Sequence, residues 1–178
     1  MSPRTAMIAV APALAASQPL DALTPADVCR EAAVDEAMFI EAFGDVTGYL
    51  VAVQQAFMDR LRDRIVAVTA GVPPGLRRIQ LATETYLSGC LAERPLRGWL
   101  LQARMLPQVL AGLRRQNQVY YVIIGTELES LGWPDGAAAA RLYLAMINAA
   151  GIVEHRLGPQ PRTREALWHF LTRGAPLA

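Results

Sequence analysis

The sequence predicts an all-α fold, because three observations agree. Nearly every segment between proline and glycine residues repeats its apolar side chains every three or four positions, which is the period of an α-helix. No run of alternating apolar and polar residues reaches the length of a strand. Hydrophobic residues make up 53% of the 178 residues and charged residues 19%, so the chain has enough apolar material for a core and is not a disordered tail. We therefore predict nine helices, three short ones followed by six longer ones.

The three short helices come first. A weak helix covers 5–17 and ends before Pro19; Pro12 weakens it, since an interior proline costs roughly 3 kcal/mol. Thr24 stands as an N-cap with Pro25 at the first helical position, which predicts a second helix over 24–32. Asp35 caps a third helix that extends through 42.

The six longer helices follow Asp45, which caps a helix running to residue 69. Its apolar stripe predicts packing along one face: Val46, Leu50, Val53, Phe57, Leu61, Ile65 and Val68. Glycine and proline residues at 71–75 end this helix. Further helices are predicted at 76–92, from Pro95 onward, and at 107–130, 137–157 and 163–172.

Composition and spacing exclude several classes of protein. Cys29 and Cys90 lie far apart, so neither a disulfide framework nor a zinc site is indicated, and a cytoplasmic location is expected. His155 and His169 lie in different predicted helices, and no acidic residues near them have the spacing of a catalytic or metal site. We therefore expect that the protein is not an enzyme and binds no metal and no cofactor. The most apolar stretch, 137–153, carries Arg141 and Asn148, and no membrane span is expected.

The short helices around residue 33 have the helix-turn-helix arrangement, in which the second short helix lies in the major groove of DNA. At these residues the chain resembles the tetracycline-repressor (TetR) family of bacterial regulators. Asp21-Ala22-Leu23-Thr24 and Ala26-Asp27-Val28 resemble the start of the family's second helix, and Ala33-Val34 stands where Gly-Val is usual. Phe43 and Asp45 resemble the exit into its fourth helix. The resemblance extends backward through Ile8, Ala11, Leu14 and Ala16, and forward in the order of helices.

The resemblance implies an N-terminal three-helix helix-turn-helix domain, 1–46, and a C-terminal six-helix domain, 47–178, for ligand binding and dimerisation. It implies a homodimer that binds a small apolar or amphipathic ligand. Eight residues would line the ligand pocket, and core packing is the alternative role of each: Tyr86, Trp99, Gln102, Met105, Asn117, Tyr120, Tyr121 and Ile124. The residues that would form the dimer interface are Leu142, Ala145, Met146, Ala149, Ile152, Leu167, Trp168 and Phe170.

The segment that would read DNA departs from the family's usual composition. Ile40 stands where a tyrosine is usual, Glu41 where a basic residue is common, and Val46 where a lysine usually follows the cap. Between residues 24 and 45 one basic residue, Arg30, is set against six acidic ones: Asp27, Glu31, Asp35, Glu36, Glu41 and Asp45. Carboxylates are repelled by phosphates and can read a base edge only as acceptors. The remaining candidate DNA contacts are Arg4, Thr24, Arg30 and Met38.

Two functions fit this pattern. The first is a TetR-like transcriptional regulator with weakened or atypical operator binding, in which a ligand shifts the helix after Asp45 and changes the separation of the two recognition helices. The second is a TetR-like ligand-binding or protein-interaction module that does not bind DNA directly. The net charge of +1 conceals the acidic segment, because residues after 45 carry 15 arginines against 9 acids.

Overall fold

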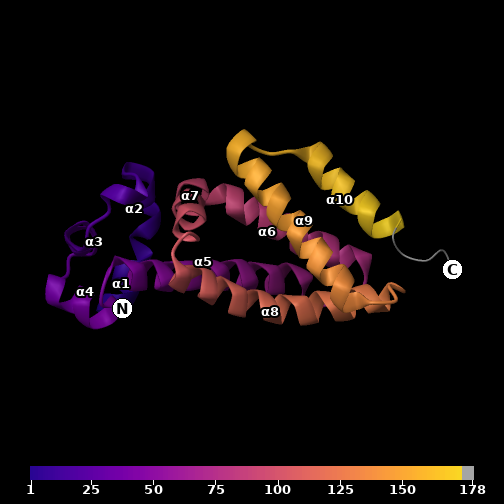
Figure 1. The fold of residues 1–178 in the computed structure, drawn as a ribbon, viewed down its shortest axis with the longest axis horizontal. Coiled ribbons are helices and arrows are strands. Elements are labelled where there is room, and N and C mark those ends of the chain that lie inside the picture. The colour runs from indigo at the N-terminus through magenta and orange to yellow at the C-terminus, as the bar shows by residue number, and fades with distance from the viewer. Residues whose placement is uncertain (174–178) are drawn as a thin grey trace. The chain divides into compact units, whose positions relative to one another are not determined.

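The computed structural model describes residues 1–173, so the last five residues of the predicted second domain lie outside it. Every regular element within those residues is helical, which confirms the all-α prediction (Figure 1). The elements are α1 (Pro3–Ala9), α2 (Ala11–Ser17), the 3-10 turn η1 (Leu20–Ala22), α3 (Pro25–Ala32), α4 (Glu36–Phe43), α5 (Val46–Thr69), α6 (Leu76–Ala92), α7 (Arg94–Ala103), α8 (Pro107–Ser130), α9 (Gly136–Leu157) and α10 (Pro161–Arg173).

The helix predicted over 5–17 is two helices rather than one. Helix α1 ends at Ala9 and α2 begins at Ala11, with Val10 between them. Pro12 then lies in the first turn of α2, where its missing N–H needs no partner. An unbroken helix would instead press the Pro12 ring against the carbonyl of Ile8, four residues earlier. The break removes this conflict.

Helices α5, α6 and α8 begin and end close to the predicted positions. The Asp45 side chain caps α5, since its Oδ1 accepts a hydrogen bond from the backbone N–H of Gly48 at 2.8 Å. A Cβ at Gly48 would collide with the carbonyl oxygen of Phe43, so this turn requires glycine. The predicted stripe of α5 is buried as far as Leu61, beyond which Val68 is 45% exposed.

The chain forms two compact units, which are divided differently from the boundary expected after residue 46. Unit 1 comprises Met1–Arg60 and Glu93–Arg114, and unit 2 comprises Leu61–Ala92 together with the residues from Arg115 onward. Unit 1 therefore holds α1–α4, the first part of α5, α7 and the start of α8. The N-terminal helices share this unit with α7 because α2 packs extensively on it.

The core of unit 1 joins α1, α3, α4 and α7 to the first part of α5. Tyr49 is fully buried, and its hydroxyl donates a hydrogen bond to the carbonyl oxygen of Met7 at 3.0 Å. Burial raises the pKa of the Tyr49 phenol, so this donor stays protonated. The other large apolar side chains that are at most 2% exposed include Met7, Phe39, Leu50, Phe57, Leu96 and Leu100.

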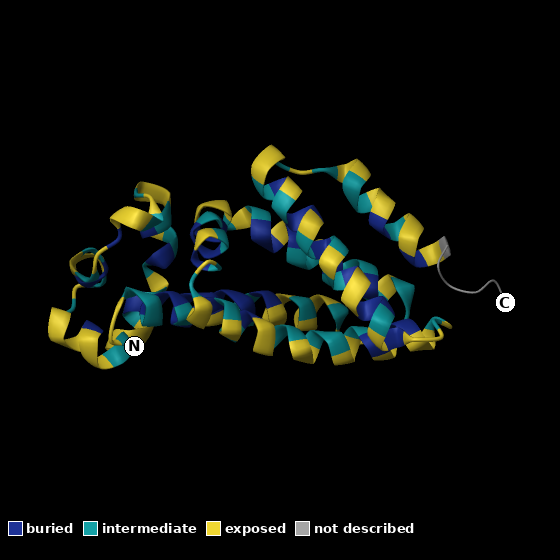
Figure 2. Ribbon diagram, viewed as in Figure 1, coloured by how far each residue is buried: buried dark blue, intermediate teal, exposed yellow. Residues whose placement is uncertain are grey.

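The core of unit 2 lies where α6 and α9 pack together. The buried hydroxyls of Thr83 and Tyr143 share a hydrogen bond of 2.7 Å. Around this bond lies an apolar cluster made of Ile79, Leu87, Leu128, Ala139, Ala140, Ile147, Ala150, Leu167 and Leu171. Gly136 begins α9 against Gly125 of α8, and a Cβ at residue 136 would collide with the Gly125 carbonyl oxygen. Figure 2 shows that α9 alternates buried and exposed surface along its length.

Two buried carboxylates hold the helix ends of unit 2. Glu154 is 1% exposed; its Oε1 lies 2.7 Å from Nε of Arg164, and its Oε2 lies 2.8 Å from Nη2. Glu127 pairs with Arg78 and accepts a hydrogen bond from the backbone N–H of Gly75 at 3.0 Å. These contacts attach α10 to α9 and the start of α6 to α8.

Among the described residues, α9 is the one helix long and apolar enough to cross a membrane by length and composition. In the most apolar 18-residue stretch of α9, 39% of the residues are buried inside the structure. A core helix of a soluble protein can have the same length and composition.

Candidate functional site

Helix α3 begins at the predicted N-cap, Thr24, which exchanges hydrogen bonds with Asp27 in the first turn. The hydroxyl of Thr24 accepts a hydrogen bond from the backbone N–H of Asp27 at 3.2 Å, and the Asp27 carboxylate accepts one from the backbone N–H of Thr24 at 3.0 Å. Hydrogen bonds from the side chains of Thr24 and Arg30 lower the pKa of Asp27 to about 2. Thr24, a predicted DNA contact, is therefore engaged as a cap.

The turn between α3 and α4 depends on a residue with a left-handed backbone. Ala33 has φ 53° and ψ 49°, a conformation that alanine adopts at a cost and glycine adopts freely. The backbone N–H of Val34 donates to the carbonyl oxygen of Cys29 at 3.0 Å and closes the turn. This geometry places α4 after α3 as in a helix-turn-helix.

Helix α4 is anchored on its inner side by aromatic rings. Phe39 is fully buried, and its ring centroid lies 5.3 Å from that of Phe43 and 5.7 Å from that of Tyr49. Phe43 and Tyr49 meet edge to face at 5.2 Å. Asp35 stands at the N-cap position, although its side chain makes no capping hydrogen bond. The rings fix the orientation of α4, so its remaining side chains point outward.

We call the outward side chains of this helix the α4 face: Glu36, Ala37, Met38, Ile40 and Glu41, all of which are exposed. Ile40 is 57% exposed and Met38 is 39% exposed. No basic residue belongs to this face. Since phosphate neutralisation by basic side chains supplies much of the affinity for DNA, the α4 face lacks the usual means of holding DNA.

Both arginines predicted to contact DNA already have partners within unit 1. Nη2 of Arg30 lies 2.6 Å from Oδ1 of Asp27. The guanidinium of Arg4 donates to the carbonyl oxygen of Ala42, and its carbon lies 4.7 Å from the centroid of the Phe43 ring. Arg4 therefore connects α1 to the end of α4, whereas the Arg30 pair lies within α3 and leaves 71% of the Arg30 side chain exposed.

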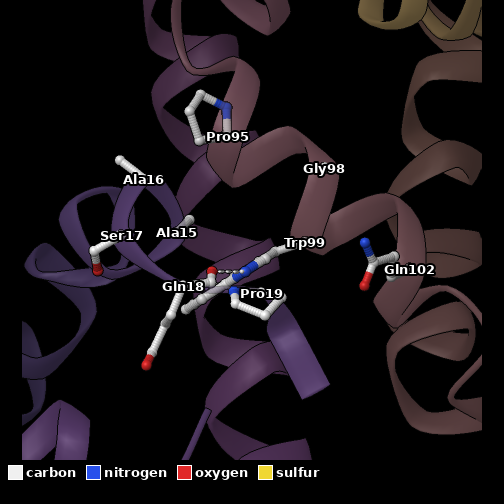
Figure 3. Close-up of a pocket in the computed structure, with 9 residues that line it drawn as sticks. All are labelled: Ala15, Ala16, Ser17, Gln18, Pro19, Pro95, Gly98, Trp99 and Gln102. Atoms are coloured by element: carbon white, nitrogen blue, oxygen red, sulfur yellow. Dashed lines mark hydrogen bonds between the residues drawn. The ribbon is translucent and has the colours of Figure 1, made fainter. Parts of the chain in front are cut away.

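Two of the predicted pocket residues, Trp99 and Gln102, border one hollow in unit 1 (Figure 3). Its volume is about 420 Å³, and its other lining residues come from the end of α2 and the start of α7: Ala15, Ala16, Ser17, Gln18, Pro19, Pro95 and Gly98. Trp99 is 3% exposed, and its indole N–H donates to the carbonyl oxygen of Gln18 at 3.1 Å. This bond links α7 to the end of α2.

The structure does not place the other predicted pocket residues in this hollow. Met105 is 86% exposed at the end of α7. The remaining five belong to unit 2, where all are half-buried: Tyr86, Asn117, Tyr120, Tyr121 and Ile124. Tyr86 and Ile124 pack against the core of that unit.

Sequence reasoning missed two buried polar side chains in unit 1. Arg97 is fully buried, with its guanidinium carbon 6.0 Å from the centroid of the Phe57 ring. Gln54 is 2% exposed, and neither polar atom of its amide has a hydrogen-bond partner among the described residues. One signal was available for Gln54, which lies four residues after Leu50 and three before Phe57 on the apolar stripe of α5.

The predicted dimer-interface residues divide between surface and core. Leu142 is 67% exposed and Phe170 is 63% exposed, and Ala145 and Ala149 are also exposed. Met146, Ile152 and Trp168 are half-buried. Leu167 is 5% exposed because α10 turns it into the core of unit 2, so its side chain is not available to a partner in this conformation.

Neither the sequence models of known families nor any curated protein matches the chain. Solved structures do match it over nearly its whole length. A protein of unknown function from Rhodococcus sp. RHA1 is 21% identical, with a TM-score of 0.76 over 99% of this chain and 97% of that one. The ketosteroid transcriptional regulator KstR2 of Mycobacterium tuberculosis is 16% identical, with a TM-score of 0.56 over 97% and 93%. The TetR family repressor AlkX from Dietzia sp. strain DQ12-45-1b, implicated in the biodegradation of n-alkanes, is 20% identical, with a TM-score of 0.54 over 98% of each chain.

Proposed function

We propose that this chain, which has the fold of the TetR-family regulators, is a homodimeric, ligand-responsive regulator of transcription in the cytoplasm whose own binding to operator DNA is weakened. The fold is shared with a TetR family repressor and a transcriptional regulator over nearly the full length of each chain. We propose no enzymatic activity, since the structural neighbours that carry a functional name are regulators.

The composition of the α4 face carries the proposal of weakened operator binding. Glu36 and Glu41 are exposed where a DNA reader would present neutral or basic groups. Each carboxylate brought near a phosphate adds repulsion and releases no counterions. A DNA contact by Arg4 would also require its side chain to leave Phe43 and the carbonyl oxygen of Ala42.

A small apolar or amphipathic molecule is the proposed ligand. The hollow beside Trp99 is open to solvent and combines apolar side chains such as Pro95 with the polar side chains of Ser17, Gln18 and Gln102, which suits an amphipathic molecule. Because Trp99 bonds to Gln18, a ligand that moves α7 would also move the end of α2. The predicted residues of unit 2 stay candidates for further contacts.

The proposed dimer surface is centred on the exposed residues Leu142, Ala145 and Ala149 of α9 and Phe170 of α10. Ala145 and Ala149 are small enough to let a second helix approach closely, and Leu142 and Phe170 supply apolar area to bury.

A second candidate function is a ligand-binding or protein-interaction module that does not bind DNA at all. The partners of Arg4 favour it, since they engage within the chain one of the two basic side chains that precede residue 46.

The binding of the purified protein to its own upstream DNA, measured from about 50 mM to about 200 mM salt, separates these functions. For the weakened regulator we expect affinity no tighter than about micromolar at the low-salt end, little changed by Arg30→Glu. Arg77→Glu, an exposed charge reversal on α6, is the matched control. Nanomolar binding that Arg30→Glu abolishes would contradict the proposal, and no binding at about 50 mM salt would favour the second candidate.

A further inference from the structure

The α4 face exposes apolar side chains that the fold does not need. The packing of α4 is carried by Phe39 and Phe43 on its inner side. Ile40 and Met38 lie outside that packing, with 57% and 39% of their surfaces in water. A polar residue at either position would keep the helix in place and remove apolar surface from water. The exposed apolar area therefore points to a contact beyond this chain.

The charges around the same helix restrict what can cover it. Glu36 and Glu41 lie on the α4 face, and Glu31, Asp35 and Asp45 are exposed on the adjoining segments. The one basic residue of this stretch, Arg30, pairs with Asp27. An anionic surface, whether DNA or an acidic membrane, would be repelled. A neutral apolar surface would bury the carboxylates without partners, which is costly.

A surface that places cations beside an apolar pocket satisfies both sets of side chains. Arginine or lysine would pair with Glu36 and Glu41, and the pocket would receive Ile40, which lies on the same side of the helix; Met38, two residues earlier, faces another direction. A second copy of the same face cannot do this, because two-fold contact would set carboxylate against carboxylate.

We propose that the α4 face docks on another protein whose surface carries arginine or lysine around an apolar pocket. The proposal rests on the proposed function, in which operator binding by α4 is weakened. It assigns the helix that occupies the recognition position to protein binding.

A labelled synthetic helix tests this docking. The probe is a 15-residue amphipathic peptide with leucines at helical spacing and arginines elsewhere, and its twin carries glutamate in place of every arginine. Fluorescence anisotropy at about 50 mM salt should show micromolar binding of the basic peptide to the full-length protein and none of the acidic one. Absence of binding by the basic peptide would overturn the proposal.

Separate variants distinguish docking from general charge attraction. Ile40→Ser and the pair Glu36→Gln with Glu41→Gln should each weaken binding by about threefold to tenfold, the first by removing apolar contact and the second by removing ion pairs. The matched control combines Val122→Ser, an exposed apolar site on α8, with Glu165→Gln, an exposed acid on α10, and should leave the affinity within about twofold. Unchanged binding by Ile40→Ser, or an equal loss in the control, would overturn the proposal.

Two further readouts keep the result interpretable. Circular dichroism checks that each variant is folded, and Ile40→Ala replaces Ile40→Ser if that variant is not. DNA binding of the native protein is measured on the same sample. Nanomolar operator binding contradicts the proposed function itself, whereas absence of peptide binding by the native protein, together with weak DNA binding, contradicts only the docking proposal.

Discussion

Two exposed apolar regions of this protein differ in the residues that surround them. On the α4 face, Ile40 is 57% exposed between Glu36 and Glu41. On α9, Leu142 is 67% exposed on a helix whose one acidic residue, Glu154, is buried. Small side chains and the absence of acids allow α9 to meet its two-fold copy, whereas carboxylates on α4 would repel theirs. We therefore propose different partners for the two regions: a second copy of this chain at α9 and a basic protein at α4.

The largest expected effect is on the assembly. Ala145→Arg would put a long cation where α9 is proposed to meet its copy, and should raise the dimer dissociation constant by about 100-fold or more because the charge is buried without a partner. Sedimentation velocity at micromolar concentration should then show monomer. Ile40→Arg on the α4 face is the matched control and should stay dimeric. A dimer with Ala145→Arg would place the interface elsewhere.

A smaller effect is expected from the ion pair that attaches α10 to α9. Glu154→Gln leaves Arg164 without its charged partner and should lower the free energy of unfolding by about 2–3 kcal/mol, less than for a fully buried pair because Arg164 is 19% exposed. Urea unfolding measures this difference. Glu165→Gln, an exposed acid on the same helix, should change it by less than about 0.5 kcal/mol. An equal effect of both variants would mean that the buried pair is not responsible.

The same pair gives this prediction a pH dependence. Burial raises the pKa of Glu154, but hydrogen bonds from Arg164 and the backbone of Gln160 outweigh it, so the pKa lies below its ordinary value. Because the pKa of Glu154 is lower in the folded protein than in the unfolded chain, its charged form stabilises the fold. This contribution is complete at pH values above the pKa of the unfolded chain, and it is lost as the pH falls through the pKa of the folded protein. The difference in free energy of unfolding between Glu154→Gln and the native protein should have its full size above about pH 5 and should become smaller below about pH 4.

The smallest expected effect is in the turn that places α4. Ala33 has a left-handed backbone, which glycine adopts without the steric cost that alanine incurs. Ala33→Gly should therefore raise the free energy of unfolding by about 0.5–1 kcal/mol. Part of the relief is offset because glycine also increases the conformational entropy of the unfolded chain. Thermal unfolding measures the shift. Ala37→Gly, inside α4, should be destabilising by about the same amount. If Ala33→Gly lowers the midpoint temperature of unfolding as Ala37→Gly does, the turn is not strained.

Much of the fold could be predicted from local patterns. The apolar period and the proline and glycine residues located α5, α6 and α8, and Thr24 begins α3 with the expected cap. The break at Val10 was missed because the apolar period continues through it, while the clash that causes it involves Pro12 and the carbonyl of Ile8.

The candidate site was less predictable, because burial depends on which helices meet. Leu167 has the composition of an interface residue, yet α10 packs it inside unit 2. Arg97 looks like a surface cation in sequence, and the packing of α7 with its neighbours buries it completely. The bond from Trp99 to Gln18 joins residues far apart in the chain, so no local pattern indicates it.

The sequence by itself determined that this protein is helical, that α4 carries acids and that Asp27 lies one helical turn from Arg30, since these follow from residue order and local charge. Only the tertiary structure decided that Ile40 is exposed while Phe39 is buried, and that Arg4 is engaged by Ala42 and Phe43. The reason is physical: local propensity and charge act between neighbours in sequence, whereas exposure and pairing depend on distances that packing alone sets.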